Sequence, residues 1–165
     1  MKILKFIAGY LWSNIKTTDH KIKVFLNIVN LINILNPPYK WELYKRGWKH
    51  DLSKYRWVES SLLAQVIFKL KGTTYGSKEY NDFLKFLKPM TELHYKKNRH
   101  HPEYHKNGIV DMTIIDKLEM IADWQAATQR HGNGDIFKSI EINQKRFGYD
   151  DKTKEWLISI AKILD

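Results

Sequence analysis

Cysteine is absent from the 165-residue sequence. Disulfides, thiolate zinc sites and cysteine nucleophiles are therefore excluded, and any metal site must use histidine, carboxylate and water as ligands. Long hydrophobic runs are also absent. The most apolar stretch, Val24–Leu35, spans twelve residues and contains three asparagines, so it is too short to cross a bilayer. No small-residue cleavage site follows the start of the chain, so no export signal is expected.

Acidic residues are scarce in the first two thirds of the chain. Residues 1–106 carry 20 basic and 8 acidic side chains, whereas residues 107–165 carry 8 and 10, and the whole chain has a net charge of +10. A basic body of this kind attracts phosphate in a nucleotide, a nucleic acid or a membrane surface. A lysine-rich surface that only keeps the protein soluble has the same charge, so charge alone leaves these alternatives open.

Helical periodicity dominates the sequence, and no clear alternating pattern predicts a strand. We therefore predict an all-α protein with one compact domain over residues 1–165. Pro37 and Pro38 end the second helix, Pro89 predicts a kink or break, and turns are expected at 72–76 and 131–134. The expected helices cover about 2–14, 20–35, 39–48, 51 or 53 to 70, 78–98, 111 or 113 to 130, 135–147 and 153–164.

Four of the seven histidines lie in the segment Glu92–His105. On a helix, His94, Asn98 and His101 would share one face. Neutral imidazole is a good ligand for transition metals and needs neighbours to complete a coordination sphere. The segment is therefore a candidate metal site, with a polar surface stretch that contains incidental histidines as the alternative.

The pair His50-Asp51 is followed by Leu-Ser-Lys, which places Lys54 four residues after His50. If this stretch is helical, His50 and Lys54 project in the same direction. A metal ligand beside an ammonium group suits a site where a metal-bound phosphate also needs a cationic contact.

Three carboxylates form one stripe on the helix expected after residue 113: Asp116, Glu119 and Asp123. Such a stripe is often simply solvated. This helix is rich in apolar residues, however, and a carboxylate that faces inward needs a metal ion or a histidine as partner.

Together with His20, these residues run in the order His…His-Asp…His…His…Asp, which resembles the HD-domain superfamily of all-α metal-dependent phosphohydrolases. The strings HDLSK, HYKKNRHHPEY and EMIADW look like those of a phage and bacterial family that we associate with this superfamily. The resemblance covers about residues 20–124, the predicted metal-site core. The first helix and the helices within 135–165 lie outside it and are unassigned. A cytoplasmic location in a bacterium or a phage-infected host is expected.

The resemblance implies one or two divalent ions. Mixed histidine and carboxylate ligands suit manganese, iron, cobalt, nickel or zinc, and leave the identity of the metal open. The Gly-Tyr-Pro motif of some relatives is missing, which argues against a cyclic dinucleotide substrate. The implied ligands of the first ion are His20, His50, Asp51 and Asp123; those of the second are Asp51, His94 and either His100 or His101.

Four residues are predicted to act in catalysis. Lys54 and Arg99 would neutralise a phosphoryl group as its charge develops. Glu119 is a candidate general base, or a residue that orients a ligating histidine. Asn98 would bind substrate or fix a ligand.

We therefore expect an enzyme, a metal-dependent phosphohydrolase that cleaves a nucleotide or another small phosphate ester with metal-activated water. One alternative is a nucleic-acid-binding module, because Trp41, Trp48 and Trp57 are interleaved with basic residues, although their spacing also allows core packing. An iron-dependent oxygenase on the same scaffold is the other alternative, and ligand count does not separate it from a hydrolase. The substrate and the oligomeric state are not readable from the sequence.

Overall fold

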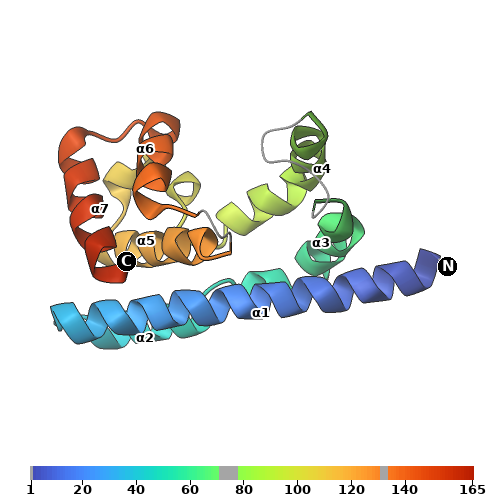
Figure 1. Ribbon diagram of the computed structural model, residues 1–165, viewed down its shortest axis with the longest axis horizontal. Coiled ribbons are helices and arrows are strands. Elements are labelled where there is room, and N and C mark those ends of the chain that lie inside the picture. Colours follow the sequence, from blue (N-terminus) through green and yellow to red (C-terminus); the bar gives the residue numbers. More distant parts are fainter. Residues whose placement is uncertain (1, 71–77, 131–133) are drawn as a thin grey trace. The chain divides into compact units, whose positions relative to one another are not determined.

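The computed structural model of the chain describes residues 2–70, 78–130 and 134–165 (Figure 1). Within these ranges all regular structure is helical and no strand is found, so the predicted all-α class is confirmed for them. The turn expected at 72–76 and most of the one at 131–134 lie outside the described residues. The α-helices are α1 (Lys2–Leu35), α2 (Lys40–Lys49), α3 (Trp57–Leu70), α4 (Lys78–Tyr95), α5 (Ile114–Thr128), α6 (Ile136–Phe147) and α7 (Asp151–Leu164). Three 3-10 helices are η1 (Leu52–Tyr55), η2 (Pro102–Tyr104) and η3 (Gly108–Asp111).

The chain divides into two compact units, each built from two separate stretches. Unit 1 contains Met1–Asp19 and Asp51–Asn98, and unit 2 contains His20–His50 and Arg99–Asp165. The predicted metal ligands are therefore distributed over both units.

The helix α1 is continuous, although the sequence analysis expected two helices with a break after residue 14. The hydroxyl of Thr18 donates to the carbonyl of Asn14 at 2.9 Å, and the Asn14 amide donates to the carbonyl of Tyr10 at the same distance. These polar side chains thus bond to the turn that precedes them instead of capping a new helix. No glycine or proline interrupts residues 10–35, and Asn36, with φ 40°, ends the helix before the two prolines as predicted.

In unit 2, α5 packs against α2, α6 and α7 (Figure 1). Gly47 lets α2 lie close to α1, because a Cβ at this position would come within 3.0 Å of Ile28 Cδ1. The Asn27 amide ties α1 to α5 by donating to the carbonyl of Ala122 at 3.1 Å. The largest fully buried apolar side chains of this core are Ile28, Leu31, Leu43, Leu118, Met120, Ile121, Ile136, Ile140 and Leu157.

In unit 1, α3 packs against α4 around a small apolar cluster. Gly9 allows the first part of α1 to touch α3, because a Cβ at residue 9 would overlap the carbonyl oxygen of Ala64. The helix α4 continues through Pro89, where a kink or break was expected, and it ends at Tyr95, earlier than predicted. Within the described ranges, the helices lack an apolar stretch long enough to cross a membrane.

Candidate metal centre

The carboxylates of α5 face into unit 2. Asp116 and Glu119 are buried, with 0% and 2% of their surface exposed, and the side chain of Asp123 is 15% exposed. Thr113 fixes the start of the helix through a capping box, in which its hydroxyl accepts from the N–H of Asp116 and the Asp116 carboxylate accepts from the N–H of Thr113. The stripe predicted from spacing therefore lies where each carboxylate needs a partner.

His20 and His50 meet Asp123 in a first buried group. The Nε2 atom of His20 lies 2.7 Å from Asp123 Oδ1, and the Nε2 atom of His50 lies 3.7 Å from the same oxygen. One ligand atom of each residue lies within 4.8 Å of the other two. Burial alone would raise the pKa of the Asp123 carboxyl, but hydrogen bonds with His20 and His50 hold this pKa well below its usual range. The group thus offers an ionised carboxylate and two imidazoles, a donor set that suits a divalent transition metal.

Glu119 joins His50 to His100 in a second group that shares His50 with the first. The Nδ1–H of His50 donates to Glu119 Oε1 at 2.9 Å, and His100 Nδ1 lies 3.3 Å from the same oxygen. Burial would raise the pKa of Glu119, but the hydrogen bonds with His100 and His50 lower it far below its usual range. A His50 ring that donates from Nδ1 keeps its Nε2 lone pair for a ligand. Glu119 is therefore placed to orient His50, one of the two roles expected for it.

Arg46 neutralises the carboxylates of α5 and was not identified from the sequence. Its Nε donates to Glu119 Oε2 at 2.7 Å, and its Nη1 donates to Asp116 Oδ1 at 2.9 Å. Arg46 lies four residues before His50, the residue that follows α2, so the two side chains leave the same side of the chain. This spacing is the sequence signal that would have found it.

Arg99 completes the ion pairs around Asp116. Its Nη2 donates to Asp116 Oδ2 at 3.0 Å and its Nε donates to Oδ1 at 3.2 Å. Burial would raise the pKa of Asp116, but the hydrogen bonds from Arg99, Thr113 and Arg46 lower it. The Arg99 side chain remains 44% exposed, so part of the guanidinium still faces solvent, where its expected contact with a phosphoryl group would have to be made.

In unit 1, Asp51 pairs with both His94 and Lys54. His94 Nε2 lies 3.1 Å from Asp51 Oδ1, and the Lys54 ammonium donates to Asp51 Oδ2 at 2.5 Å. The prediction that His50 and Lys54 share a helical face is wrong, because α2 ends at Lys49 and Asp51 has a left-handed backbone conformation, with φ 56°, before η1. The 3-10 turn instead brings Lys54 back onto the carboxylate three residues before it.

Glu59 holds the other ring nitrogen of His94 and was also missed. Glu59 Oε2 lies 3.1 Å from His94 Nδ1 and accepts a hydrogen bond from the hydroxyl of Ser53 at 3.0 Å. Burial would lower the pKa of His94, but hydrogen bonds with Asp51 and Glu59 raise it. No spacing marks Glu59, because its partner is 35 residues away and an acidic residue is ordinary in the first turn of a helix.

The helical face expected for His94, Asn98 and His101 does not form, because α4 ends at Tyr95. The Asn98 amide instead donates to the carbonyl of His94 at 2.7 Å and to the hydroxyl of Ser53 at 3.0 Å. Asn98 thereby connects the end of α4 to Ser53, and its two expected roles stay predictions.

Of the two adjacent histidines in unit 2, His100 belongs to the Glu119 group. His100 is 2% exposed, and the centroid of its ring lies 4.3 Å from that of His50. The ring of His101 is tilted against that of His100 with a centroid separation of 4.1 Å. His100 thus contacts Glu119, and the choice between His100 and His101 as a ligand of the second ion stays open.

Comparison with protein-family models matches residues 12–163 to DUF5662, a family of unknown function. The chain belongs to the DUF5662 family. The match includes every residue of the buried groups in this DUF5662 member, and it extends over α6 and nearly all of α7, which the sequence analysis left unassigned. Searches of curated proteins and of solved structures find no match.

Proposed function

We propose that the chain is a metal-dependent phosphohydrolase of the HD-domain type that acts on a nucleotide or another small phosphate ester. The observation that carries this proposal is the buried group of His20, His50 and Asp123, with Glu119 behind His50. An ionised carboxylate beside buried imidazoles is costly in a protein core unless it has partners or binds a cation. The order of these residues along the chain, which resembles that of HD-domain enzymes, supports the assignment.

The contacts of the residues in this group suggest a different role for each of them in metal binding. His20, His50 and Asp123 would bind one divalent ion, while Glu119, neutralised by Arg46, would keep the His50 ring oriented. A transition metal bound there supplies a Lewis acid that lowers the pKa of a bound water to near neutrality.

Unit 1 carries a comparable pair of donors, Asp51 and His94, with Lys54 beside them. The Lys54 ammonium would meet the oxygens of a phosphoryl group, because a cation stabilises the negative charge that develops there in the transition state.

Metal analysis and a hydrolysis screen test the proposal. We expect the purified chain to contain a transition metal and to hydrolyse at least one nucleotide or phosphate ester, with activity lost on chelation and restored by the metal. Asp123→Asn should lose both properties, and the exposed Glu155→Gln, on α7, should retain both. A chain that binds no metal would overturn the proposal, and iron-dependent oxygen consumption without hydrolysis would favour an oxygenase.

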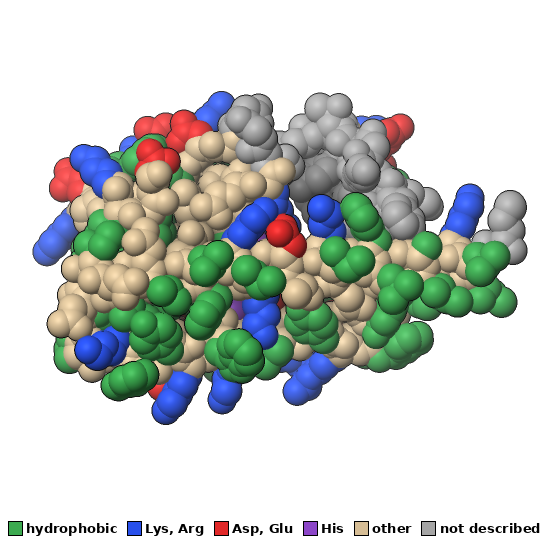
Figure 2. Space-filling view, turned by 60° about the horizontal axis from the view of Figure 1, so that its bottom comes forward, with side chains coloured by type: hydrophobic (Ala, Val, Ile, Leu, Met, Phe, Trp, Pro, Cys, Tyr) green, Lys and Arg blue, Asp and Glu red, His purple; other side chains and the backbone are tan. Residues whose placement is uncertain are grey.

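A second candidate function, binding of single-stranded nucleic acid, is favoured by the surface of α2. Trp41 and Trp48 are 70% and 68% exposed, so they do not have the core role that their spacing allowed. The rings of Trp41 and Tyr44 lie 5.7 Å apart, and the Lys21 ammonium lies 5.3 Å from the ring of Trp48. Figure 2 shows hydrophobic side chains beside Lys and Arg side chains on the face that carries α1 and α2. Exposed rings among cations stack on bases and neutralise phosphates.

Mobility shifts with single-stranded DNA or RNA separate the two candidates. If α2 binds nucleic acid, a shift should appear at physiological salt in the presence of a chelator and survive Asp123→Asn. Replacing Trp41 and Trp48 by alanine should then weaken binding by about tenfold or more, the scale of lost base stacking. The absence of a shift for the unmodified chain would remove this candidate.

A further inference from the structure

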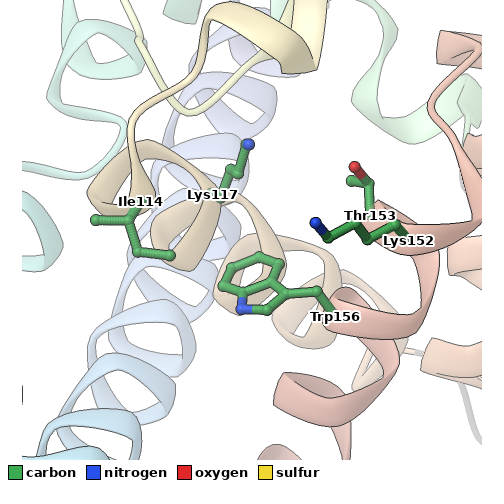
Figure 3. Close-up of a pocket in the computed structure, with 5 residues that line it drawn as sticks. All are labelled: Ile114, Lys117, Lys152, Thr153 and Trp156. Atoms are coloured by element: carbon green, nitrogen blue, oxygen red, sulfur yellow. The ribbon is translucent and has the colours of Figure 1, made fainter.

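Unit 2 has a pocket whose residues play no part in the metal centre. It is an open pocket of about 290 Å³, lined by Ile114 and Lys117 of α5 and by Lys152, Thr153 and Trp156 of α7. Figure 3 shows the Trp156 ring below the two lysine side chains, with the Lys152 ammonium directed toward the space above the ring.

The lining of this pocket is positively charged. It contains two ammonium groups and no carboxylate. No ion pair is found for Lys117 or Lys152 among the residues that the structure describes, whereas the nearby Lys154 lies 3.6 Å from Glu141. Asp151, which is adjacent to Lys152 in sequence, accepts a hydrogen bond from the Gln144 amide at 2.9 Å. Asp150 interacts electrostatically with Lys152, but its carboxylate also caps α7 by accepting from the N–H of Thr153 at 2.8 Å.

A hydroxyl adds to the ammonium groups of this lining. Lys117 lies near the start of α5 and Lys152 near the start of α7. Carboxylates already occupy both helix ends, Asp116 in the capping box of α5 and Asp150 as the cap of α7, so the helix ends add no free charge to the pocket. The hydroxyl of Thr153 is a further donor in the lining. The pocket therefore combines two ammonium groups with a hydroxyl, and both kinds of group favour an anion.

The remaining wall is apolar. The Trp156 ring is half-buried and packs partly on the core of unit 2, and Ile114 lies at the opposite side of the pocket (Figure 3). A flat indole face accommodates a planar ring by stacking, and the aliphatic side chain of Ile114 adds an apolar wall beside it. The ligand that matches this pocket thus has an aromatic ring and a phosphate within one small molecule.

We propose that this pocket binds a nucleoside monophosphate, with the base against Trp156 and the phosphate between Lys117 and Lys152. The site is distinct from the metal centre, because Lys117 and Glu119 are two residues apart on α5 and point to nearly opposite sides of the helix. Binding here requires no metal.

Isothermal titration calorimetry tests the proposal. The full chain is titrated with AMP, adenosine or inorganic phosphate in a chelating buffer at physiological salt. We expect AMP to bind, and adenosine and phosphate to bind at least tenfold more weakly, since each offers only half of the recognised chemistry. The double variant Lys117→Gln/Lys152→Gln should lose about tenfold or more in AMP affinity, the scale of a lost charge-assisted hydrogen bond. Lys154→Gln removes a charge from the same helix and should leave the affinity unchanged.

Three results would overturn the proposal: no binding of AMP, equal binding of AMP and of either fragment, or an AMP affinity that survives the double lysine variant. Asp123→Asn distinguishes the pocket from the metal centre. It should leave AMP affinity unchanged, and a loss of affinity in this variant would place the nucleotide at the metal centre instead. Because both lysines lie at the surface, melting curves of the double variant and of Lys154→Gln should coincide, which confirms that the fold is intact.

Discussion

Glu119 Oε1 accepts a hydrogen bond from Nδ1 of His50 at 2.9 Å. The other carboxylate oxygen accepts from Arg46 Nε at 2.7 Å, so the carboxylate is held from both sides. Because Nδ1 of His50 is the donor, its Nε2 is the atom that can bind a cation, and this nitrogen lies on the side of Asp123. This relationship explains why an ionised carboxylate is buried behind a predicted metal ligand.

Replacing Glu119 should therefore weaken metal binding without removing a donor from the group of His20, His50 and Asp123. Glu119→Gln keeps the shape of the side chain but loses its charge, so we expect transition-metal affinity to fall by about tenfold to a hundredfold. Competition with a chromophoric chelator measures this change. Glu42→Gln, an exposed carboxylate on α2, is the control, and an effect no larger than that of the control would contradict an orienting role for Glu119.

Metal binding should also stabilise the fold, because the unfolded chain lacks the assembled site. At a free metal concentration one hundred times Kd, the free energy of unfolding should rise by about 2.7 kcal/mol, which a higher Tm reports. Asp123→Asn should abolish this gain. Calcium, which prefers oxygen ligands, should give a much smaller shift than zinc or manganese, and an equal response to calcium would argue against a histidine-containing site.

The parts of the fold that could be predicted from the sequence are those with local signals. The prolines after Asn36 end α1, and helices expected to begin near Thr113 and Asp135 have these residues as the N-caps of α5 and α6. The helix α7 begins at Asp151, two residues before its expected start. These signals act within a few residues, so one sequence contains them in full. The inward stripe on α5 followed from helical spacing in the same way.

Other features depend on conformations and contacts that spacing does not encode. The continuity of α1 was not predicted, because a polar residue such as Thr18 either caps a new helix or, as here, bonds to the preceding turn. The left-handed residue Asp51 changes the direction of the chain and moves Lys54 away from its expected place. Glu59 could not be assigned, because its partner His94 is distant in sequence.

In a chelating buffer that keeps the protein free of metal, Asp116 should make the free energy of unfolding depend on pH. Its pKa is lowered in the folded state from an ordinary value of 3.8, so its ionised form stabilises the fold above that value, and this stabilisation is lost as the pH falls through the folded-state pKa. At pH 7, Asp116→Asn should cost about 2 kcal/mol, because the buried group would lose the charge that strengthens its hydrogen bonds from Arg99 and Arg46. The difference between variant and unmodified chain should shrink below about pH 4.

Urea denaturation between pH 7 and pH 3 measures this dependence. Asp82→Asn is the matched control, because Asp82 pairs with Lys85 at 3.2 Å on an exposed face, where ion pairs contribute little. A pH-independent difference between Asp116→Asn and the unmodified chain would show that the charge of Asp116 is not what stabilises the fold.

Variants of Lys54 distinguish a catalytic role of this residue from a structural one. An ammonium group cannot ligate a metal at neutral pH, so its use beside Asp51 is to balance that carboxylate or to meet a phosphate. If it meets the phosphate, Lys54→Ala should lower turnover by about two to four powers of ten, the scale of a lost electrostatic contact in the transition state, and leave metal content nearly unchanged. Lys54→Arg should rescue poorly, because a planar guanidinium differs in reach and shape from a compact ammonium.

The pair of Lys85 and Asp82 supplies a matched control for Lys54, since it lies in the same unit and has the same spacing of three residues but is exposed to solvent. Lys85→Ala should therefore change neither turnover nor metal content. Measuring hydrolysis rate, metal stoichiometry and Tm on both variants decides the role of Lys54. An unaltered rate in Lys54→Ala would exclude Lys54 from the reaction. Loss of metal together with rate would instead assign Lys54 to holding Asp51, because the uncompensated carboxylate would then disturb the site around it.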